Sequence, residues 1–388
     1  MIRLLAGIFI KNKEQFEQPE VRRAYGMLCS IVGIGLNVLL FAGKYLAGVL
    51  SGSIAITADA FNNLSDAGSS VITLVGFKFS GMKPDKDHPF GHGRFEYLSG
   101  LGVAMLIILM GFELLKSAVN KILHPEPVET GVVAVAILIV SVCVKLYMSV
   151  YNRKIGDKID SEAMKATATD SLSDSVATSA VLISMLAAHV TGVQIDGWCG
   201  LVVAGLVLLA GWKAAKDTID PLLGGPPSKE FVNSIKEIVM DHKEIIGIHD
   251  LVVHDYGPGR CMISLHGEVP ANGDIIVLHD LIDHIEKELG EKLGCDAVIH
   301  MDPLETDNEK ITEMKHELLT YINSELPGIS IHDFRMVQGP THTNLIFDAV
   351  VPHEFHMTNE EVRNGLEKVV AKHWENTFAV IHVEQSYI

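Results

Sequence analysis

The sequence has few cysteines and none of the motifs of nucleotide-driven chemistry. Its five cysteines in 388 residues show no CxxC spacing, so we expect neither a zinc knuckle nor a disulfide framework. The absence of a Walker loop, a Rossmann fingerprint and a nucleophile motif argues against an enzyme and against an ATP-driven pump. A polar stretch over residues 11–23 follows the first ten residues without a small-residue cleavage pattern, so no cleaved signal peptide is expected.

Basic residues become scarce after residue 216. Residues 1–216 carry 17 acidic and 19 basic side chains, whereas residues 217–388 carry 31 acidic and 12 basic ones. Nucleic-acid binding requires lysine and arginine to neutralise phosphates, so the acidic region argues against a nucleic-acid partner. The same acidity is suited to attracting divalent cations.

Six apolar segments are long enough to cross a bilayer, which requires about 20 residues. They lie near residues 25–50, 54–79, 95–119, 130–151, 163–190 and 196–215. The connectors 51–53 and 191–193 lack basic residues, whereas the N-terminal segment and the alternate loops contain lysine and arginine. By the positive-inside rule, both termini therefore face the cytoplasm. The alternative is a soluble protein with six buried helices, which would not require this charge asymmetry.

Proline and glycine between residues 221 and 228 mark a linker, after which helices alternate with short strands. Landmarks in this region recur at an offset of 82 or 83 residues, such as His249-Asp250 with His332-Asp333 and Ile299-His300 with Ile381-His382. Fixed spacing predicts a duplicated unit, with chance similarity as the alternative. The fold class expected is therefore an α-helical membrane domain with six transmembrane helices, followed by two tandem small α+β (ferredoxin-like) cytoplasmic domains. The expected boundaries are 1–24 for a cytoplasmic N-terminal segment, 25–219 for the transport domain, 220–228 for the linker, 229–303 for the first cytoplasmic domain and 304–388 for the second.

Two matched polar pairs interrupt the apolar segments. Asn62 and Asp66 are four residues apart, as are Asp170 and Asp174, so each pair lies on one face of a helix. Carboxylates at membrane depth are costly and mark an ion pathway by default. Four oxygen donors without histidine or cysteine favour a hard cation such as Mn²⁺ over Zn²⁺, although Fe²⁺ and Co²⁺ also enter oxygen sites. The alternative is that these polar residues only join helices to each other.

The loop between the second and third apolar segments contains the ligand types of a small metal site: Asp85, His88 and His92. Pro89, Gly91 and Gly93 prevent a continuous helix there, so a loop must shape the site. A structural hinge is the alternative.

Histidines recur on separate predicted elements of the first cytoplasmic domain: His249, His266, His279 and His300, with Asp250 and Asp302 beside them. They predict a bound metal, with incidental surface histidines as the alternative. The second copy keeps His332 and His382 but has Asp348 in place of His266 and Glu384 in place of Asp302. We therefore expect it to bind less metal or none.

Residues 18–303 resemble the cation diffusion facilitator family. The features that carry the resemblance are six membrane helices, the two polar pairs, the loop sequence His-Pro-Phe-Gly-His-Gly and the later Ile-His-Met-Asp-Pro. The resemblance implies a homodimer that exports divalent metal from the cytoplasm in exchange for protons. Zinc exporters of the family typically have histidine at the position of Asp170 and aspartate at that of Asn62, so this combination resembles manganese-type members. The second α+β copy lies outside the usual length of the family, and extra dimer surface is its expected role.

The resemblance also implies roles for the residues named above. Asn62, Asp66, Asp170 and Asp174 correspond to the transport site, and Asp85, His88 and His92 to a loop site. The cytoplasmic binuclear site corresponds to His249, His266, His279, His300 and Asp302. No cofactor is expected, because the divalent metal is the substrate and, in the cytoplasmic domain, a regulatory ion.

The function expected is thus divalent metal/proton antiport by alternating access, with Mn²⁺ as cargo. The alternatives are the same transport with Zn²⁺, Fe²⁺ or Co²⁺, and a membrane-anchored metal sensor or storage protein. The expected partners are a second copy of the chain, the lipid bilayer, metal ions and protons. The expected location is a bacterial inner membrane with both termini in the cytoplasm.

Overall fold

The computed structural model describes residues 1–16, 18–51, 54–124, 132–191, 196–305, 308–352 and 355–386. The chain divides into two compact units. The first comprises residues 1–225 together with 255–260, and the second comprises residues 226–254 and 261–388.

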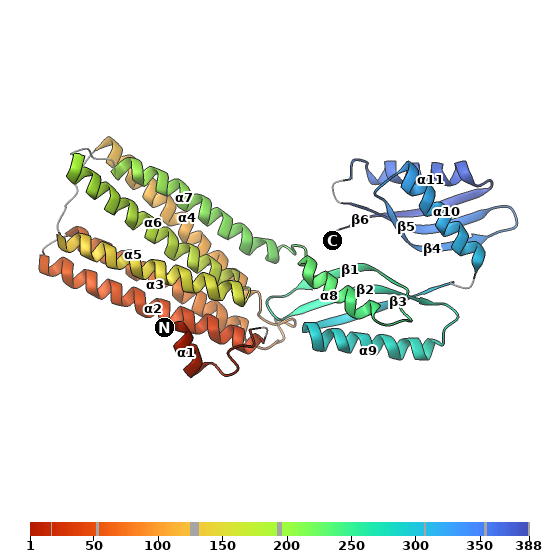
Figure 1. The fold of residues 1–388 in the computed structure, drawn as a ribbon, viewed down its shortest axis with the longest axis horizontal. Helices are drawn as coiled ribbons and strands as arrows, with labels where there is room; N and C mark the ends of the chain where they lie inside the picture. The colour runs from red at the N-terminus through yellow and green to blue at the C-terminus, as the bar shows by residue number, and fades with distance from the viewer. Residues whose placement is uncertain are drawn as a thin grey trace. The chain divides into compact units, whose positions relative to one another are not determined.

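The first unit consists of one short and six long helices (Figure 1). They are α1 (Ile2–Phe9), α2 (Pro19–Ser51), α3 (Ile54–Ser80), α4 (Phe95–Leu123), α5 (Val132–Lys158), α6 (Glu162–Thr191) and α7 (Asp196–Leu222). The long helices have 27 to 33 residues, which at 1.5 Å per residue spans about 40–50 Å and exceeds the hydrocarbon core of a bilayer. The most extensive packing joins α4 to α7, α2 to α3 and α5 to α6.

Four of these helices are apolar enough to cross a membrane within the residues that the structure describes: α2, α4, α5 and α7. Large apolar side chains on α4 and α7 are exposed, including Leu109, Phe112, Leu209 and Trp212, as expected of surfaces that face lipid. The other two long helices, α3 and α6, contain the matched polar pairs, which lower their hydropathy. The chain thus has a helical membrane domain, while the crossing of all six helices stays a prediction.

The second unit contains helix, strand, strand, helix and strand, and then the same order again. The first set is α8 (Lys229–Met240), β1 (Gly247–Asp255), β2 (Cys261–Pro270), α9 (Ile275–Leu293) and β3 (Cys295–Leu304). The second set is α10 (Glu309–Glu325), β4 (Ser330–Gln338), β5 (Thr343–Pro352), α11 (Asn359–His373) and β6 (Thr377–Ser386). A ferredoxin-like unit has the order βαββαβ. Each set therefore matches that order without its first strand in the described residues.

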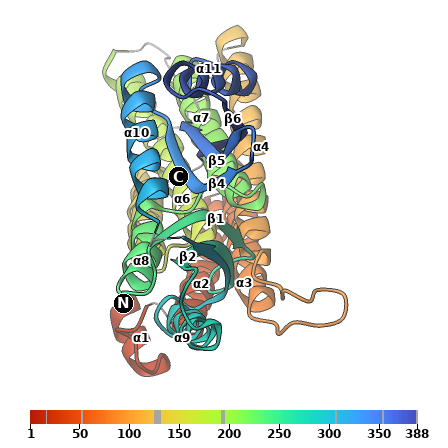
Figure 2. The same cartoon turned by 90° about the vertical axis from the view of Figure 1, so that its right-hand side faces the viewer.

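Each set forms a three-stranded sheet with its second strand in the middle, in the orders β1-β2-β3 and β4-β5-β6. In both sheets the last two strands are parallel, with Leu265 opposite Ile299 and Phe347 opposite Ile381. The helices of each set pack on their own sheet around a separate apolar core, as Figure 2 shows for α10 and α11. The side chains of Leu265, Ile285 and Leu289 are buried in the first core, and those of Leu318, Leu345 and Phe347 in the second.

Local sequence determines where these elements begin and bend. The side chain of Asp274 accepts hydrogen bonds from the first backbone N–H groups of α9, and Thr358 and Glu361 form a capping box at the start of α11. Asp250 in β1 and Asp333 in β4 both adopt a φ of 51°, the left-handed conformation that aspartate and asparagine tolerate better than other non-glycine residues. These two residues follow His249 and His332, so the same backbone distortion directs both histidines.

Candidate metal centres

Three of the four predicted transport residues converge between α3 and α6. Asp66 and Asp170 are only 6% and 3% exposed, and the side chain of Asp174 is nearly as buried. The hydroxyl of Ser69 on α3 donates a hydrogen bond of 2.7 Å to Asp170 Oδ2 on α6, which ties the two polar pairs together. The matched spacing in the sequence therefore places three carboxylates in one buried region.

Lys145 of α5 completes this buried network. Its Nζ donates hydrogen bonds of 2.7 Å to Asp66 Oδ2 and 2.6 Å to Asp174 Oδ2, and its side chain is 2% exposed. Such charge-assisted contacts are strong, and they hold a cation between two carboxylates from different helices. Reasoning from the sequence missed Lys145. The available signal was that it is a basic residue within the apolar stretch of α5, where a charged residue marks function by default.

Asn62 differs from the three carboxylates in its exposure. It is exposed, and no hydrogen bond joins it to Asp66, Asp170 or Asp174 among those described. Its neighbour Asn63 is 2% exposed, and its amide nitrogen has no hydrogen-bond partner. The role of Asn62 as a metal ligand stays a prediction, and Asn63 is a second amide of interest on the same helix.

The loop residues lie together as expected. Ligand atoms of Asp85, His88 and His92 are all within 4.8 Å of one another. Asp85 Oδ1 accepts hydrogen bonds from the backbone N–H groups of His88 (2.7 Å) and Asp87 (3.0 Å), and these contacts, led by that of His88, lower the pKa of the Asp85 carboxyl. His92 Nε2 is 3.4 Å from Asp85 Oδ2, while its buried Nδ1 has no partner. One carboxylate and two imidazoles within this range fit a divalent transition metal.

The first cytoplasmic sheet brings together four of the five predicted ligands there. Asp302 of β3 is the centre: its Oδ2 is 3.2 Å from His249 Nε2 and 2.9 Å from His266 Nδ1, and its Oδ1 is 3.4 Å from His300 Nε2. His266 and His300 face each other across the parallel pair β2/β3. A carboxylate surrounded by three imidazoles has the donor set of a transition-metal site.

His279 does not join that cluster. It lies on α9 with its side chain 70% exposed, and its Nδ1 is 3.6 Å from Asp283 one turn away. In the second sheet, Asp348, His382 and Glu384 form a further group with ligand atoms within 4.8 Å of one another. The region where we expected little or no metal thus offers a ligand set of its own.

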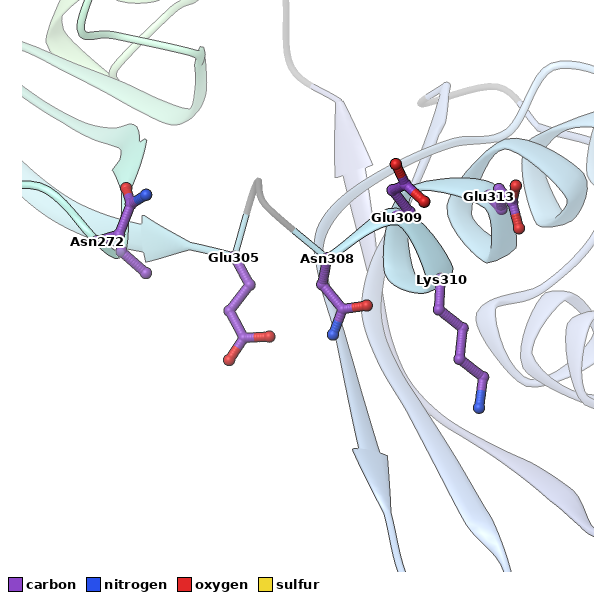
Figure 3. Close-up of a pocket in the computed structure, with 7 residues that line it drawn as sticks. Asn272, Glu305, Asn308, Glu309, Lys310 and Glu313 are labelled. Atoms are coloured by element: carbon purple, nitrogen blue, oxygen red, sulfur yellow. The ribbon is translucent and has the colours of Figure 1, made fainter.

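An open hollow at the start of α10 lies outside these clusters. Its lining includes Glu305, Glu309, Glu313 and Lys310. Figure 3 shows that these side chains project in different directions rather than toward a common point. The hollow is therefore not a metal centre of the kind described above.

Known proteins match both the helical domain and the first α+β set. Residues 30–223 match the cation efflux transmembrane domain, and residues 227–304 match the cytoplasmic domain of cation efflux proteins. The chain therefore belongs to the cation efflux family, also known as the cation diffusion facilitators. Members of this family are metal transporters of the membrane and are not enzymes, and no cofactor is indicated.

Individual relatives cover most of the family part of the chain. An uncharacterized transporter of Methanocaldococcus jannaschii is 31% identical over 277 residues, which is 71% of this chain and 96% of the relative. The manganese efflux system protein MneS of Bacillus subtilis is 28% identical over 277 residues, 71% of this chain and 95% of the relative. The cation-efflux pump FieF of Klebsiella pneumoniae is 26% identical over 297 residues, 73% of this chain and 95% of the relative. Residues 305–388 lie beyond the matched family domains.

Proposed function

We propose that this chain exports Mn²⁺ from the cytoplasm in exchange for protons, with Asp66, Asp170 and Asp174 as the transport site. The observation that carries the proposal is the convergence of the buried carboxylates of Asp66 and Asp170 with that of Asp174, which is 12% exposed, from the two helices α3 and α6. Neither cysteine nor histidine belongs to this network as described, so its donors are hard oxygens. A carboxylate must lose its proton to bind a metal, so metal and protons compete for the same oxygens. The manganese efflux relative supports the choice of cargo.

The ammonium of Lys145 competes with the metal for the carboxylate oxygens of the site. Its ammonium neutralises one of the three negative charges and bonds to Asp66 and Asp174. A single divalent cation then balances the two remaining charges. Metal binding requires the ammonium to give up at least one carboxylate oxygen, and the return of Lys145 assists metal release. We infer that Lys145 weakens binding enough for the metal to leave.

The protein works as a homodimer with six membrane-crossing helices in each subunit. The match to the cytoplasmic domain of the family supports dimer formation. The basic N-terminal segment and alternate loops support cytoplasmic termini, and the bacterial relatives support an inner-membrane location. The identical element order and sheet order of the two α+β sets support a tandem duplication, with domains at 229–303 and 304–388 after a linker at 220–228.

Metal binding in the cytoplasmic part regulates this transport. Asp302 with His249, His266 and His300 supplies one site, and Asp85 with His88 and His92 supplies the loop site. The exposed position of His279 on α9 leaves it available to the second subunit of a dimer. Zn²⁺, Fe²⁺ or Co²⁺ as cargo, and a membrane-anchored sensor or storage role, are the competing functions.

Metal uptake into proteoliposomes under an imposed pH gradient tests the proposal. We expect Mn²⁺ uptake in preference to Zn²⁺, Fe²⁺ and Co²⁺, and its loss in Asp174→Ala. The matched control is Asp157→Ala, which removes an exposed carboxylate of α5 that pairs only with Arg153 among the ion pairs described. Preferred uptake of Zn²⁺ would overturn the argument that oxygen ligands select Mn²⁺. If the pH gradient drives uptake of none of the four metals, a membrane-anchored sensor or storage role would be favoured.

A further inference from the structure

The two cytoplasmic sheets meet through histidines at equivalent positions. His249 of β1 and His332 of β4 stack with their ring centroids 4.1 Å apart and their planes at 26°. Both rings precede an aspartate with a φ of 51°. Figures 1 and 2 both place the second sheet beside the first, and β3 contacts β4. The junction between the two sheets is therefore a defined packing contact within one chain.

The ring nitrogens at this junction are buried and have no hydrogen-bond partner within the part of the chain that the structure describes. Only 8% of the His249 side chain and 13% of the His332 side chain are exposed. His249 Nδ1 is 3.3 Å from Asp250 Oδ2 and its Nε2 is 3.2 Å from Asp302 Oδ2, yet neither contact has hydrogen-bond geometry. Both nitrogens of His332 also lack a partner. Buried polar atoms are nearly always paired, and a bound ion is one of the recognised exceptions.

Two carboxylates from different sheets converge on His332. Its Nε2 is 3.8 Å from Asp250 Oδ1 of β1 and 3.8 Å from Glu384 Oε2 of β6. The carboxylates of Asp250 and Glu384 thus approach the same imidazole from different sheets. Two carboxylates that approach one imidazole repel each other, and a proton or a cation between them removes that repulsion. The separation of 3.8 Å between His332 Nε2 and each carboxylate oxygen is close to that between two ligands of one metal ion, which lie about 2.0–2.2 Å from the ion.

We propose that a divalent transition-metal ion binds at this junction, coordinated by Asp250, His332 and Glu384, and joins the two cytoplasmic domains of one chain. His332 and Glu384 lie beyond the matched family domains, which end at residue 304. The ion is distinct from the cluster around Asp302, although His249 lies between the two and directs one ring nitrogen toward each. A neutral imidazole has one free lone pair, so His249 serves one ion at a time. The proposal does not depend on transport.

Substitution of Asp250 by asparagine tests the site with little change in shape. Asparagine tolerates the left-handed conformation of Asp250, so Asp250→Asn removes the charge while the backbone is kept. Asp333→Asn is the matched control, because Asp333 has the same φ and its carboxylate bonds to Arg335. Glu384→Gln is the second variant, on the other sheet.

The measurement is the number of ions bound per full-length chain in detergent, after chelation and reloading with Co²⁺, together with the visible absorption of the bound Co²⁺. We expect Asp250→Asn and Glu384→Gln each to bind one ion fewer than the wild type, and Asp333→Asn to bind the same number. His300→Ala should remove an ion with a different spectrum, since it affects the cluster around Asp302. Equal stoichiometry in Asp250→Asn, Glu384→Gln and wild type would overturn the proposal. An equal loss in Asp333→Asn would also overturn it, because it would show a general electrostatic effect.

Discussion

The ammonium of Lys145 lies 2.7 Å from the carboxylate of Asp66, so a cation that belongs to the protein already binds where the metal is proposed to bind. The same ammonium lies 2.6 Å from Asp174 Oδ2 on α6. A membrane transporter of charged ions must avoid bare carboxylates in a region of low polarity, because their desolvation is expensive. Lys145 meets that requirement within the described network, and the predictions below follow from it and from the cytoplasmic clusters.

Lys145→Met should bind Mn²⁺ more tightly and transport it more slowly. The change removes the competing ammonium but keeps an unbranched side chain of similar length. Hydrogen bonds to charged groups contribute about 1.5–3 kcal/mol, so we expect the dissociation constant to fall about tenfold or more. Calorimetric titration of Mn²⁺ and uptake rates provide the measurements. Lys165→Met is the control, since Lys165 pairs with Asp160 and Glu162 instead. Unchanged affinity in Lys145→Met would contradict a competitive role.

Asn62→Asp should strengthen metal binding and slow release if Asn62 is a ligand. The change adds a fourth negative charge at a position four residues before Asp66. Asn63→Asp is the informative comparison, because Asn63 is the buried neighbour. Uptake of Mn²⁺ and of Zn²⁺ should be measured for both variants. If Asn62→Asp leaves rate and selectivity untouched while Asn63→Asp alters them, the amide that faces the pathway is Asn63.

The loop site should lose metal on acidification because protons compete with the metal for its ligands. The backbone N–H groups of His88 and Asp87 depress the pKa of the Asp85 carboxyl, so this carboxylate stays ionised to a lower pH than an ordinary aspartate. Imidazole binds metal only in its neutral form and carboxylate only when ionised, so bound metal should decline as the pH falls. Metal content of the wild type and of His92→Ala, measured as the pH is lowered, checks this. If His92→Ala shows the same decline, the titrating ion lies at another site.

Metal should draw the cytoplasmic domains of the homodimer together. The region from residue 217 onward carries 31 acidic and 12 basic side chains, so two copies repel each other until cations bind. Small-angle scattering of the dimer should show a smaller radius with Mn²⁺ than with chelator. His266→Ala should reduce this change, whereas His316→Ala, on the exposed face of α10, should not. Identical scattering in both conditions would count against metal-dependent closure.

The sequence predicted those parts of the site that depend on local periodicity. A spacing of four residues places Asp170 and Asp174 on one face of α6, and the apolar flanks predict a long helix. Lys145 escaped notice because its partners lie 79 and 29 residues away, and only the tertiary fold brings Asp66 of α3 and Asp174 of α6 within reach of its side chain. The same limit applies to His332, whose contact with His249 depends on how two sheets meet.

Resemblance to the family and local spacing predicted some features of the chain better than others. The prediction of six crossing helices includes α3 and α6. Their polar residues lower their hydropathy, and neither is among the four described helices that are apolar enough to cross a membrane. His279 was predicted with the other histidines of the first α+β unit, and its position on the exposed face of α9 could not be inferred from spacing. The loop site was the most predictable, because its three residues lie within eight positions and the turns of that loop bring them together.

The register of the parallel strands has a consequence for how such a protein diversifies. His266 lies opposite His300 in the first sheet, and Asp348 lies opposite His382 at the equivalent position of the second. The difference between histidine and aspartate at that position of the strand pair changes a nitrogen donor into an oxygen donor, while the strand register stays the same. Two domains on one chain can therefore prefer different ions, and the single polypeptide can respond to a ratio of metals rather than to the amount of one.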